Sequence, residues 1–239
     1  MGQDSRPTNR APPSHNCLRD DGEVGALYRL LGCAVAVVAL LGACSGDGLP
    51  SDFAIYRGQG FSVGYPRAWK GCHGTLSFVG TNEPAVEFSG PAGKGQIIPP
   101  FIQVTDEGLK RTFDHALKFH RLLLQVNPGY KKLCERSVKV SGAKRAVQIE
   151  FHQLYPEPTP QGQPDLHGIN LLAEAPDGSV VSMLLSATAS DFSRYQKTFD
   201  DVVRSLAVGT EVAAVSSGAR NLPDCSATGT PSTSPSASG

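Results

Sequence analysis

The stretch VKVSGAKRAVQIEF, residues 138–151, carries the clearest alternation of apolar and polar residues in the sequence. Its period of two is typical of a strand with one buried face. The apolar residues that alternate are Val138, Val140, Val147, Ile149 and Phe151. Between the two halves stands Ser141-Gly142, a dipeptide typical of a tight turn. The stretch therefore predicts a β-hairpin over residues 138–151.

The same period recurs on both sides of this hairpin. It predicts further strands at residues 61–65, 76–78, 86–88, 102–104, 169–173 and 181–185. Apolar residues recur at helical spacing in two places, over Leu109–Leu124 and over Phe192–Leu206, with Ser190 as the expected N-cap of the second helix. The order of strands, helix, strands and helix predicts an α+β fold, with a mainly antiparallel sheet of about seven or eight strands flanked by amphipathic helices.

Composition limits the class of partner. The 239 residues include 22 Lys and Arg against 22 Asp and Glu, so the formal net charge is zero and nucleic acid is not an expected partner. Residues 226–239 consist only of Ser, Ala, Thr, Gly and Pro. Such a segment cannot bury enough apolar surface to fold, so residues 208–239 are predicted to form a disordered tail. The predicted folded domain is residues 53–207.

The N-terminal part of the chain predicts export and lipidation. Residues 30–43 hold no charge and follow Arg29. This run is shorter than the roughly 20 apolar residues of a transmembrane helix, but it has the length of a signal-peptide core. The following Leu41-Gly42-Ala43-Cys44 resembles a bacterial lipobox. We therefore expect a signal peptide over residues 1–43, lipidation at Cys44, a tether over 44–52, and a membrane anchor on the extracellular face.

Residues 1–23 are an unusual beginning for a signal peptide. They carry acidic residues beside basic ones and show no apolar periodicity. Our hypothesis is that they are a misannotated extension and that translation begins near Val24.

Export would leave three cysteines in an oxidising compartment, namely Cys72, Cys134 and Cys225. Three thiols allow one disulfide with three possible pairings. A bridge between Cys72 and Cys134 would lie within the domain and is slightly favoured, whereas a bridge to Cys225 would tie back the tail.

Three residues form the candidate binding surface, Trp69, Glu150 and His152. Glu150 and His152 share one face of the predicted strand, and an acid beside a base can form half of a catalytic or metal site. A solvent-facing strand gives the same pattern. Trp69 follows a strand end, where an aromatic ring can line a ligand groove, although a single tryptophan is more often part of the core.

Other motifs carry no expected chemistry. Gly60-Phe61-Ser62-Val63-Gly64 matches the serine hydrolase pattern but is better explained as a strand, because Pro66 blocks the helix that must follow the serine. His115 and His120 are five residues apart and lie on different faces of the predicted helix, so they do not share a metal; His120 is expected at the edge of the apolar stripe with a hydrogen bond. No catalytic residue, metal or cofactor is predicted.

Several of these features together resemble a known family. They are the run Gly60–Pro66 followed by Trp69, the helix after Val104, the hairpin over 138–151, and the segment from Pro176-Asp177-Gly178 to Leu206. The chain is similar to the PsbP-like fold and, within it, to LpqN-type actinobacterial lipoproteins. The resemblance covers about 150 residues, in the size range of one domain. It implies a non-catalytic binding or assembly module.

The sequence thus predicts a surface-anchored, non-catalytic lipoprotein whose domain over residues 53–207 binds an envelope protein partner or ligand. Two alternatives stay open. One is a cell-envelope enzyme with a site around Glu150 and His152. The other is a purely structural module.

Overall fold

The computed structural model describes residues 49–78, 81–93, 98–156, 159, 162–209, 222–223 and 225. The predicted signal peptide, the lipidation site Cys44 and most of the predicted tether lie outside these residues. In the part of the chain that the structure describes, no helix is both long and apolar enough to cross a membrane.

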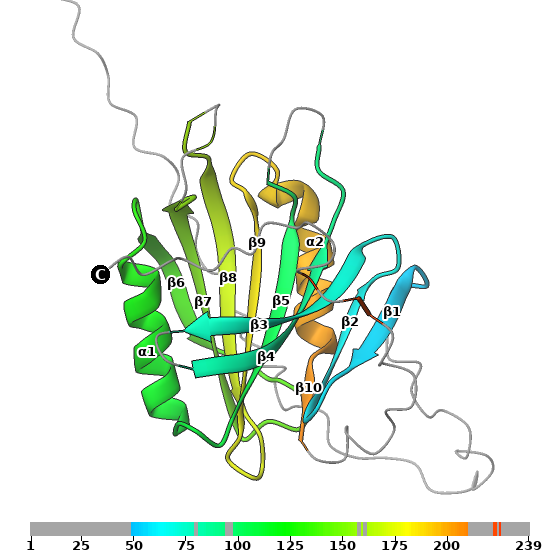
Figure 1. The fold of residues 1–239 in the computed structure, drawn as a ribbon, viewed down its shortest axis with the longest axis vertical. Coiled ribbons are helices and arrows are strands. Elements are labelled where there is room, and N and C mark those ends of the chain that lie inside the picture. The colour runs from blue at the N-terminus through cyan, green and yellow to red at the C-terminus, as the bar shows by residue number, and fades with distance from the viewer. Residues whose placement is uncertain are drawn as a thin grey trace, which may run out of the picture. The chain divides into compact units, whose positions relative to one another are not determined.

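Two antiparallel sheets and two helices make up the domain (Figure 1). A small sheet has the order β1-β2-β10, with β1 at Phe53–Arg57, β2 at Phe61–Pro66 and β10 at Ala207–Val208. The large sheet has the order β3-β4-β5-β9-β8-β7-β6. Its strands are β3 Lys70–Phe78, β4 Thr81–Ser89, β5 Phe101–Gly108, β6 Lys131–Ser137, β7 Arg145–Leu154, β8 Asp165–Glu174 and β9 Val180–Thr188. The helices are α1 Phe113–Gln125 and α2 Phe192–Ser205. The predicted α+β fold with a mainly antiparallel sheet is confirmed.

The larger core lies between the large sheet and α2. On β5 and β9, Ile102 stands opposite Leu185 and Val104 stands opposite Met183, and all four side chains are buried. From α2, Tyr195, Phe199 and Val202 join the same cluster, together with residues of the small sheet. On β5 and β9, the alternation predicted from the sequence therefore marks the face of the sheet that α2 covers.

The opposite face of the sheet carries α1. Phe113, Ala116, Leu117 and Leu124 of the helix pack against Ile149, Phe151 and Leu172 of the sheet. Because neighbouring residues of one strand point to opposite faces, Leu171 joins the α2 cluster while Leu172 joins the α1 cluster. Strands β8 and β9 are therefore buried on both faces, and the polar side chains described below are placed by this arrangement.

Helix α1 begins later than the sequence predicts, whereas α2 begins at Phe192 as predicted but with a different cap residue. Leu109 is not helical and is 72% exposed, because it follows the bulged end of β5, where Gly108 has a φ of 59°. Thr112 caps α1 instead, with its hydroxyl accepting a hydrogen bond from the backbone N–H of His115. The cap position of α2 is Asp191 rather than Ser190, and the Asp191 carboxylate accepts a hydrogen bond from Thr188 rather than from the helix.

The hairpin predicted over residues 138–151 differs from the observed one. Its two strands are β6 and β7, and the connection between them is longer than the two-residue turn predicted at Ser141-Gly142. β6 ends at Ser137, and residues 138–144 form a loop that crosses to the small sheet. There the backbone N–H of Val208 donates a hydrogen bond to the carbonyl of Ser141. A Cβ atom at Gly142 would lie 2.0 Å from the carbonyl oxygen of Val208, so this close approach requires glycine. Val138 and Val140 pack against the core as loop residues.

The predicted Cys72–Cys134 disulfide is wrong. Cys72 is joined to Cys225, and their Cα atoms are 4.9 Å apart. Cys72 lies on β3 and Cys134 on β6, which are the two opposite ends of the large sheet. A disulfide requires Cα atoms within about 7 Å, and the six strand spacings between β3 and β6 are each about 4.8 Å.

The prediction of a disordered tail over 208–239 is wrong at Val208 and Leu222. Val208 is buried, and Leu222 packs against the core.

Candidate functional site

Four ionisable side chains of β7 and β8 form what we call the histidine cluster: Glu150, His152, Asp165 and His167. His152 and His167 are direct cross-strand neighbours, with ring centroids 4.5 Å apart. His167 Nε2 is 2.7 Å from Glu150 Oε1, and His152 Nδ1 is 3.3 Å from Asp165 Oδ2. Glu150 and His152 do share one strand face, as predicted. Each is hydrogen-bonded to a residue of β8 rather than to the other.

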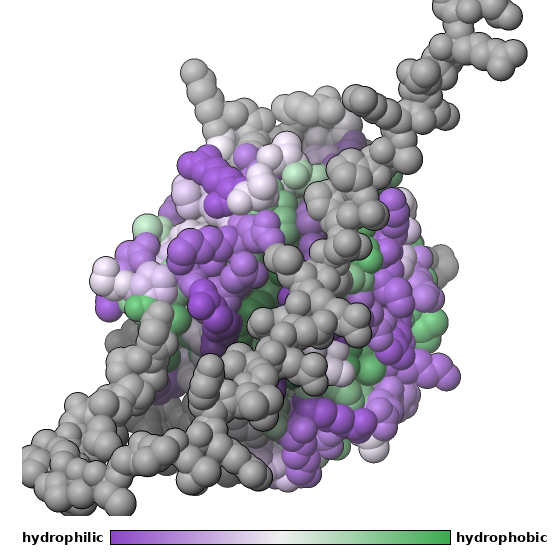
Figure 2. Space-filling model, turned by 180° about the vertical axis from the view of Figure 1, so that it is seen from behind, coloured by the Kyte–Doolittle hydropathy of each residue, from purple (hydrophilic) through white to green (hydrophobic). Residues whose placement is uncertain are grey.

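The alternation of β7 explains why the cluster lies where it does. Ile149 and Phe151 face α1, so Glu150 and His152 project from the opposite face, the one that carries α2. The ring of His167 stacks on Phe192, the first residue of α2, with centroids 3.5 Å apart. The cluster therefore lies beside the N-terminal end of α2. Figure 2 views the molecule from behind and shows a largely hydrophilic described surface with apolar residues between.

Charges of both signs border the cluster. Burial raises the pKa of Asp200 on α2, the positive charges of Arg204 and Arg136 oppose this rise, and the negative charges of Asp201 and Glu150 add to it. Glu150 and Arg136 thus lie within electrostatic reach of Asp200. A surface of this kind can donate and accept hydrogen bonds and can pair with either sign of charge. Among the described residues, no three His, Cys, Asp or Glu side chains form a group that could hold a metal ion.

Trp69 does not belong to a binding surface. Its side chain is buried and meets Tyr195 and Phe199 of α2 edge to face, with ring centroids 6.0 Å and 6.4 Å away. The prediction that Trp69 contributes to a binding surface is therefore wrong. The physical reason is that the chain after β2 passes directly beneath the apolar side of α2.

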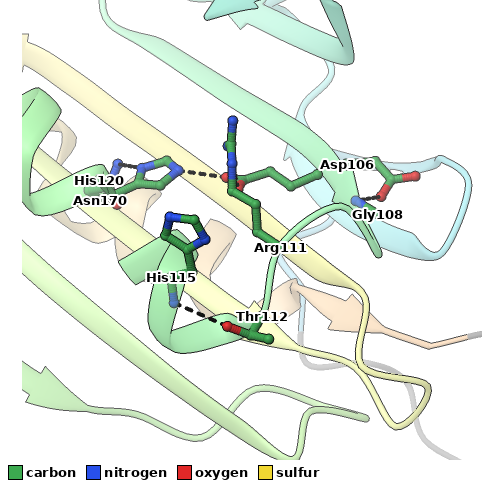
Figure 3. A network of polar contacts seen from close by, with 8 residues as sticks. Asp106, Gly108, Arg111, Thr112, His115, His120 and Asn170 are labelled. Carbon is green, nitrogen blue, oxygen red and sulfur yellow. Dashed lines mark hydrogen bonds and ion pairs between the residues drawn. The ribbon is translucent and has the colours of Figure 1, made fainter. Parts of the chain in front are cut away.

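A second polar group lies inside the molecule, on the α1 side of the sheet (Figure 3). We call it the buried network: Glu107 of β5, Arg111, His120 of α1 and Asn170 of β8. His120 Nε2 is 2.6 Å from Glu107 Oε1, and its Nδ1 is 3.2 Å from Asn170 Nδ2. Arg111 Nη1 is 3.6 Å from Glu107 Oε2. The hydrogen bond expected of His120 is present, but the residue is buried rather than at the edge of the stripe.

Glu107 is the charge on which the buried network depends, since only 1% of its surface is exposed. Burial by itself raises the pKa of this carboxyl. The hydrogen bond and charge of His120, the Ser182 hydroxyl and the charge of Arg111 outweigh that effect, so the pKa of Glu107 is lowered overall. The network joins α1 to β5 and β8, and its role is to hold the helix in position on the sheet.

Sequence reasoning missed five residues of these two sites, namely Asp165, His167, Glu107, Arg111 and Asn170. Asp165 and His167 lie at the start of β8, before the apolar alternation by which the strand was recognised. Glu107 lies at the bulge that ends β5, where the pattern of that strand is interrupted. A usable signal existed for Glu107 and His120, since each is an ionisable residue next to an apolar stripe.

Comparison with known proteins gives likenesses of fold. No protein-family model matches the chain, and no curated protein matches it. Among solved structures, PA94 of unknown function from Pseudomonas aeruginosa is similar, with 17% identity over 64% of this chain and 94% of that chain and a TM-score of 0.40.

Two other similar structures are a PsbP protein and LpqN, the two kinds of protein that the sequence resembles. Cyanobacterial PsbP (CyanoP) from Synechocystis sp. PCC 6803 has 16% identity over 70% of this chain and 98% of its own, with a TM-score of 0.48. LpqN, involved in cell envelope biogenesis of Mycobacterium tuberculosis, has 9% identity over 67% of this chain and 80% of its own, with a TM-score of 0.35. At these values the likenesses say nothing about the function of this chain.

Replacing Glu107 by glutamine is expected to destabilise the domain by about 3–5 kcal/mol at pH 7, because the partners of a buried charge are left uncompensated. The lowered pKa of Glu107 means that its contribution is present above the ordinary carboxyl pKa of about 4.3 and is lost as the pH falls through the lower folded value. Urea unfolding of the wild-type protein should therefore show a steeper loss of stability below pH 4.3 than Glu107→Gln.

The matched control is Glu174→Gln, whose carboxylate pairs with the half-exposed Arg145. Its cost should stay within about 1 kcal/mol, as for other surface ion pairs. Equal costs for the two variants would contradict a structural role for the buried network.

Proposed function

We propose that this chain is a lipid-anchored, non-catalytic lipoprotein of the bacterial cell envelope, whose domain binds a protein partner through the histidine cluster. The observation that carries the proposal is the gathering of Glu150, His152, Asp165 and His167 at partly exposed positions on two adjacent strands. The stacking of His167 on Phe192 fixes this surface to the end of α2.

The anchor rests on the sequence. Leu41-Gly42-Ala43-Cys44 follows an uncharged apolar run, and β1 begins at Phe53. Leu49 packs against the core and the carbonyl of Asp52 accepts a hydrogen bond from the backbone N–H of Arg67, so the free tether would be residues 45–48. At about 3.4 Å per residue, an extended tether of this length reaches roughly 14 Å. The domain would therefore work close to the membrane surface, and its partner would be found there.

Binding to a protein suits the geometry of the cluster. His152 and Asp165 keep 30% and 54% of their side-chain surface exposed, while His167 is held by Glu150 and Phe192. Side chains that are held in place but still accessible lose little freedom on binding, which favours affinity. The cluster lies on the face of a sheet, and polar groups with both signs of charge are typical of the rim of protein interfaces.

The alternative of an envelope enzyme built on Glu150 and His152 has weaker support. A catalytic acid and base must reach the same substrate within hydrogen-bond distance. In this structure Glu150 is engaged by His167 and His152 by Asp165, so the two predicted groups are directed to different neighbours.

The anchor is tested by Cys44→Ala in cells fed a clickable palmitate analogue. We expect the wild-type protein to carry the lipid label and to remain with the membrane fraction, and the variant to carry no label, because the lipobox thiol that would accept the diacylglycerol is gone. Cys225→Ser controls for labelling of another cysteine and should leave the signal unchanged. Continued labelling of Cys44→Ala would refute the anchor.

The binding surface is tested by placing a photo-crosslinking amino acid at position 152 and irradiating intact cells. We expect a discrete crosslinked protein band whose yield falls several-fold when Glu150→Ala removes the hydrogen-bonding partner of His167. The control position is Lys118, which is exposed on α1 at the opposite face of the sheet. The same bands from both positions, or no band from position 152, would contradict the proposed surface.

A further inference from the structure

The C-terminal segment lies against one edge of the large sheet. β3 is the last strand at that end, and β4 is its partner within the described sheet. The backbone N–H of His73 on β3 donates a 2.8 Å hydrogen bond to the carbonyl of Pro223. The Cys72–Cys225 disulfide fixes the segment two residues further on. Leu222, Pro223 and Cys225 thus lie against a sheet edge, which would otherwise present unpaired backbone groups to other chains.

The sequence of the edge leaves room for this segment. Glycine flanks Cys72 and His73 on both sides, in Gly71-Cys72-His73-Gly74. A Cβ atom at Gly71 would lie 3.0 Å from a methyl carbon of Leu222, and a Cβ atom at Gly74 would lie 3.3 Å from the sulfur of Cys225. Leu222 packs against the main core from this position. The edge therefore offers backbone hydrogen-bonding groups and a contact site for an apolar side chain. It also offers space, because Gly71 and Gly74 carry no side chain.

We infer that the outer edge of β3 at residues 71–74 is a binding site for an extended peptide segment of a partner protein, and that Leu222, Pro223 and Cys225 occupy it until the Cys72–Cys225 disulfide is opened. The site lies on a different strand from the histidine cluster. Strand addition to a sheet edge is a common mode of peptide recognition. Main-chain hydrogen bonds provide the affinity, and pockets for side chains provide the specificity. The incoming segment would need an apolar residue in the place of Leu222.

The disulfide controls the site through effective concentration. A segment tied to its own binding site competes at a local concentration that a free partner cannot match. A dithiol opens the bridge in two steps. One of its thiolates attacks a sulfur of the bridge and forms a mixed disulfide, and its second thiol then displaces the protein sulfur. Cys72 and Cys225 become thiols, and the dithiol is oxidised to a disulfide. Two electrons have therefore passed from the dithiol to the protein disulfide.

The test uses the full chain and a fluorescent peptide with the sequence of residues 218–227, in which serine replaces the cysteine. Its receptor is the full-length variant Cys72→Ser/Leu222→Asp/Cys225→Ser, in which the bridge and the apolar contact of the chain's own segment are removed. We expect the peptide to bind this variant and to bind the oxidised wild-type chain at least ten-fold more weakly. Hydrogen exchange at the His73 amide should be at least ten-fold faster in the variant than in the wild type, and saturating peptide should slow it again.

A peptide carrying Leu222→Asp is the matched control and should not bind. Failure of the first peptide to bind a variant that keeps slow exchange at its β8 and β9 amides would overturn the inference. So would equal binding to the oxidised wild-type chain, or dimerisation of the variant without peptide binding, which would assign the edge to a second copy. The same peptide is also measured against wild-type protein before and after reduction with dithiothreitol, and the absence of any gain on reduction would overturn the redox control. None of these results depends on the crosslinks at position 152.

Discussion

Burial of β8 and β9 on both faces is the constraint on which the other features depend. Leu171 packs towards α2 and its neighbour Leu172 towards α1, so a shift of β8 by one residue would exchange the two faces. The fixed register directs His167 to the side of α2 and Asn170 to the side of α1. The histidine cluster near the surface and the buried network inside the domain are therefore both placed by the alternation of side chains along β8.

The two sites differ in what surrounds them, and this difference gives them different roles. Glu107 is almost completely buried, and its charge is balanced by His120 and Arg111, so the buried network links a helix to a sheet. The histidine cluster has the same types of side chain, but His152 and Asp165 remain accessible. A partner can reach the second site, whereas the first contributes through the position of α1.

Sequence reasoning succeeded where local periodicity carries the information. The strands around Ile102, Ile169 and Met183 and the helix that begins at Phe192 lie where the apolar pattern places them. It failed where contacts join distant parts of the chain. The partner of Cys72 depends on which strands end the sheet, and the cross-strand contacts of His167 depend on register. Neither strand order nor register is contained in the period of a single segment.

A sheet buried on both faces at β8 and β9 fixes the positions of the histidine cluster and the buried network. Native-state hydrogen exchange of the full chain tests this constraint most directly, because it reports the opening free energy of each segment. We expect backbone amides at Leu171, Leu172 and Met183 to exchange only through global unfolding, and amides of β6 and of α1 near Leu122 to exchange through local opening at lower free energy. Faster exchange in the centres of β8 and β9 than in α1 would contradict this expectation.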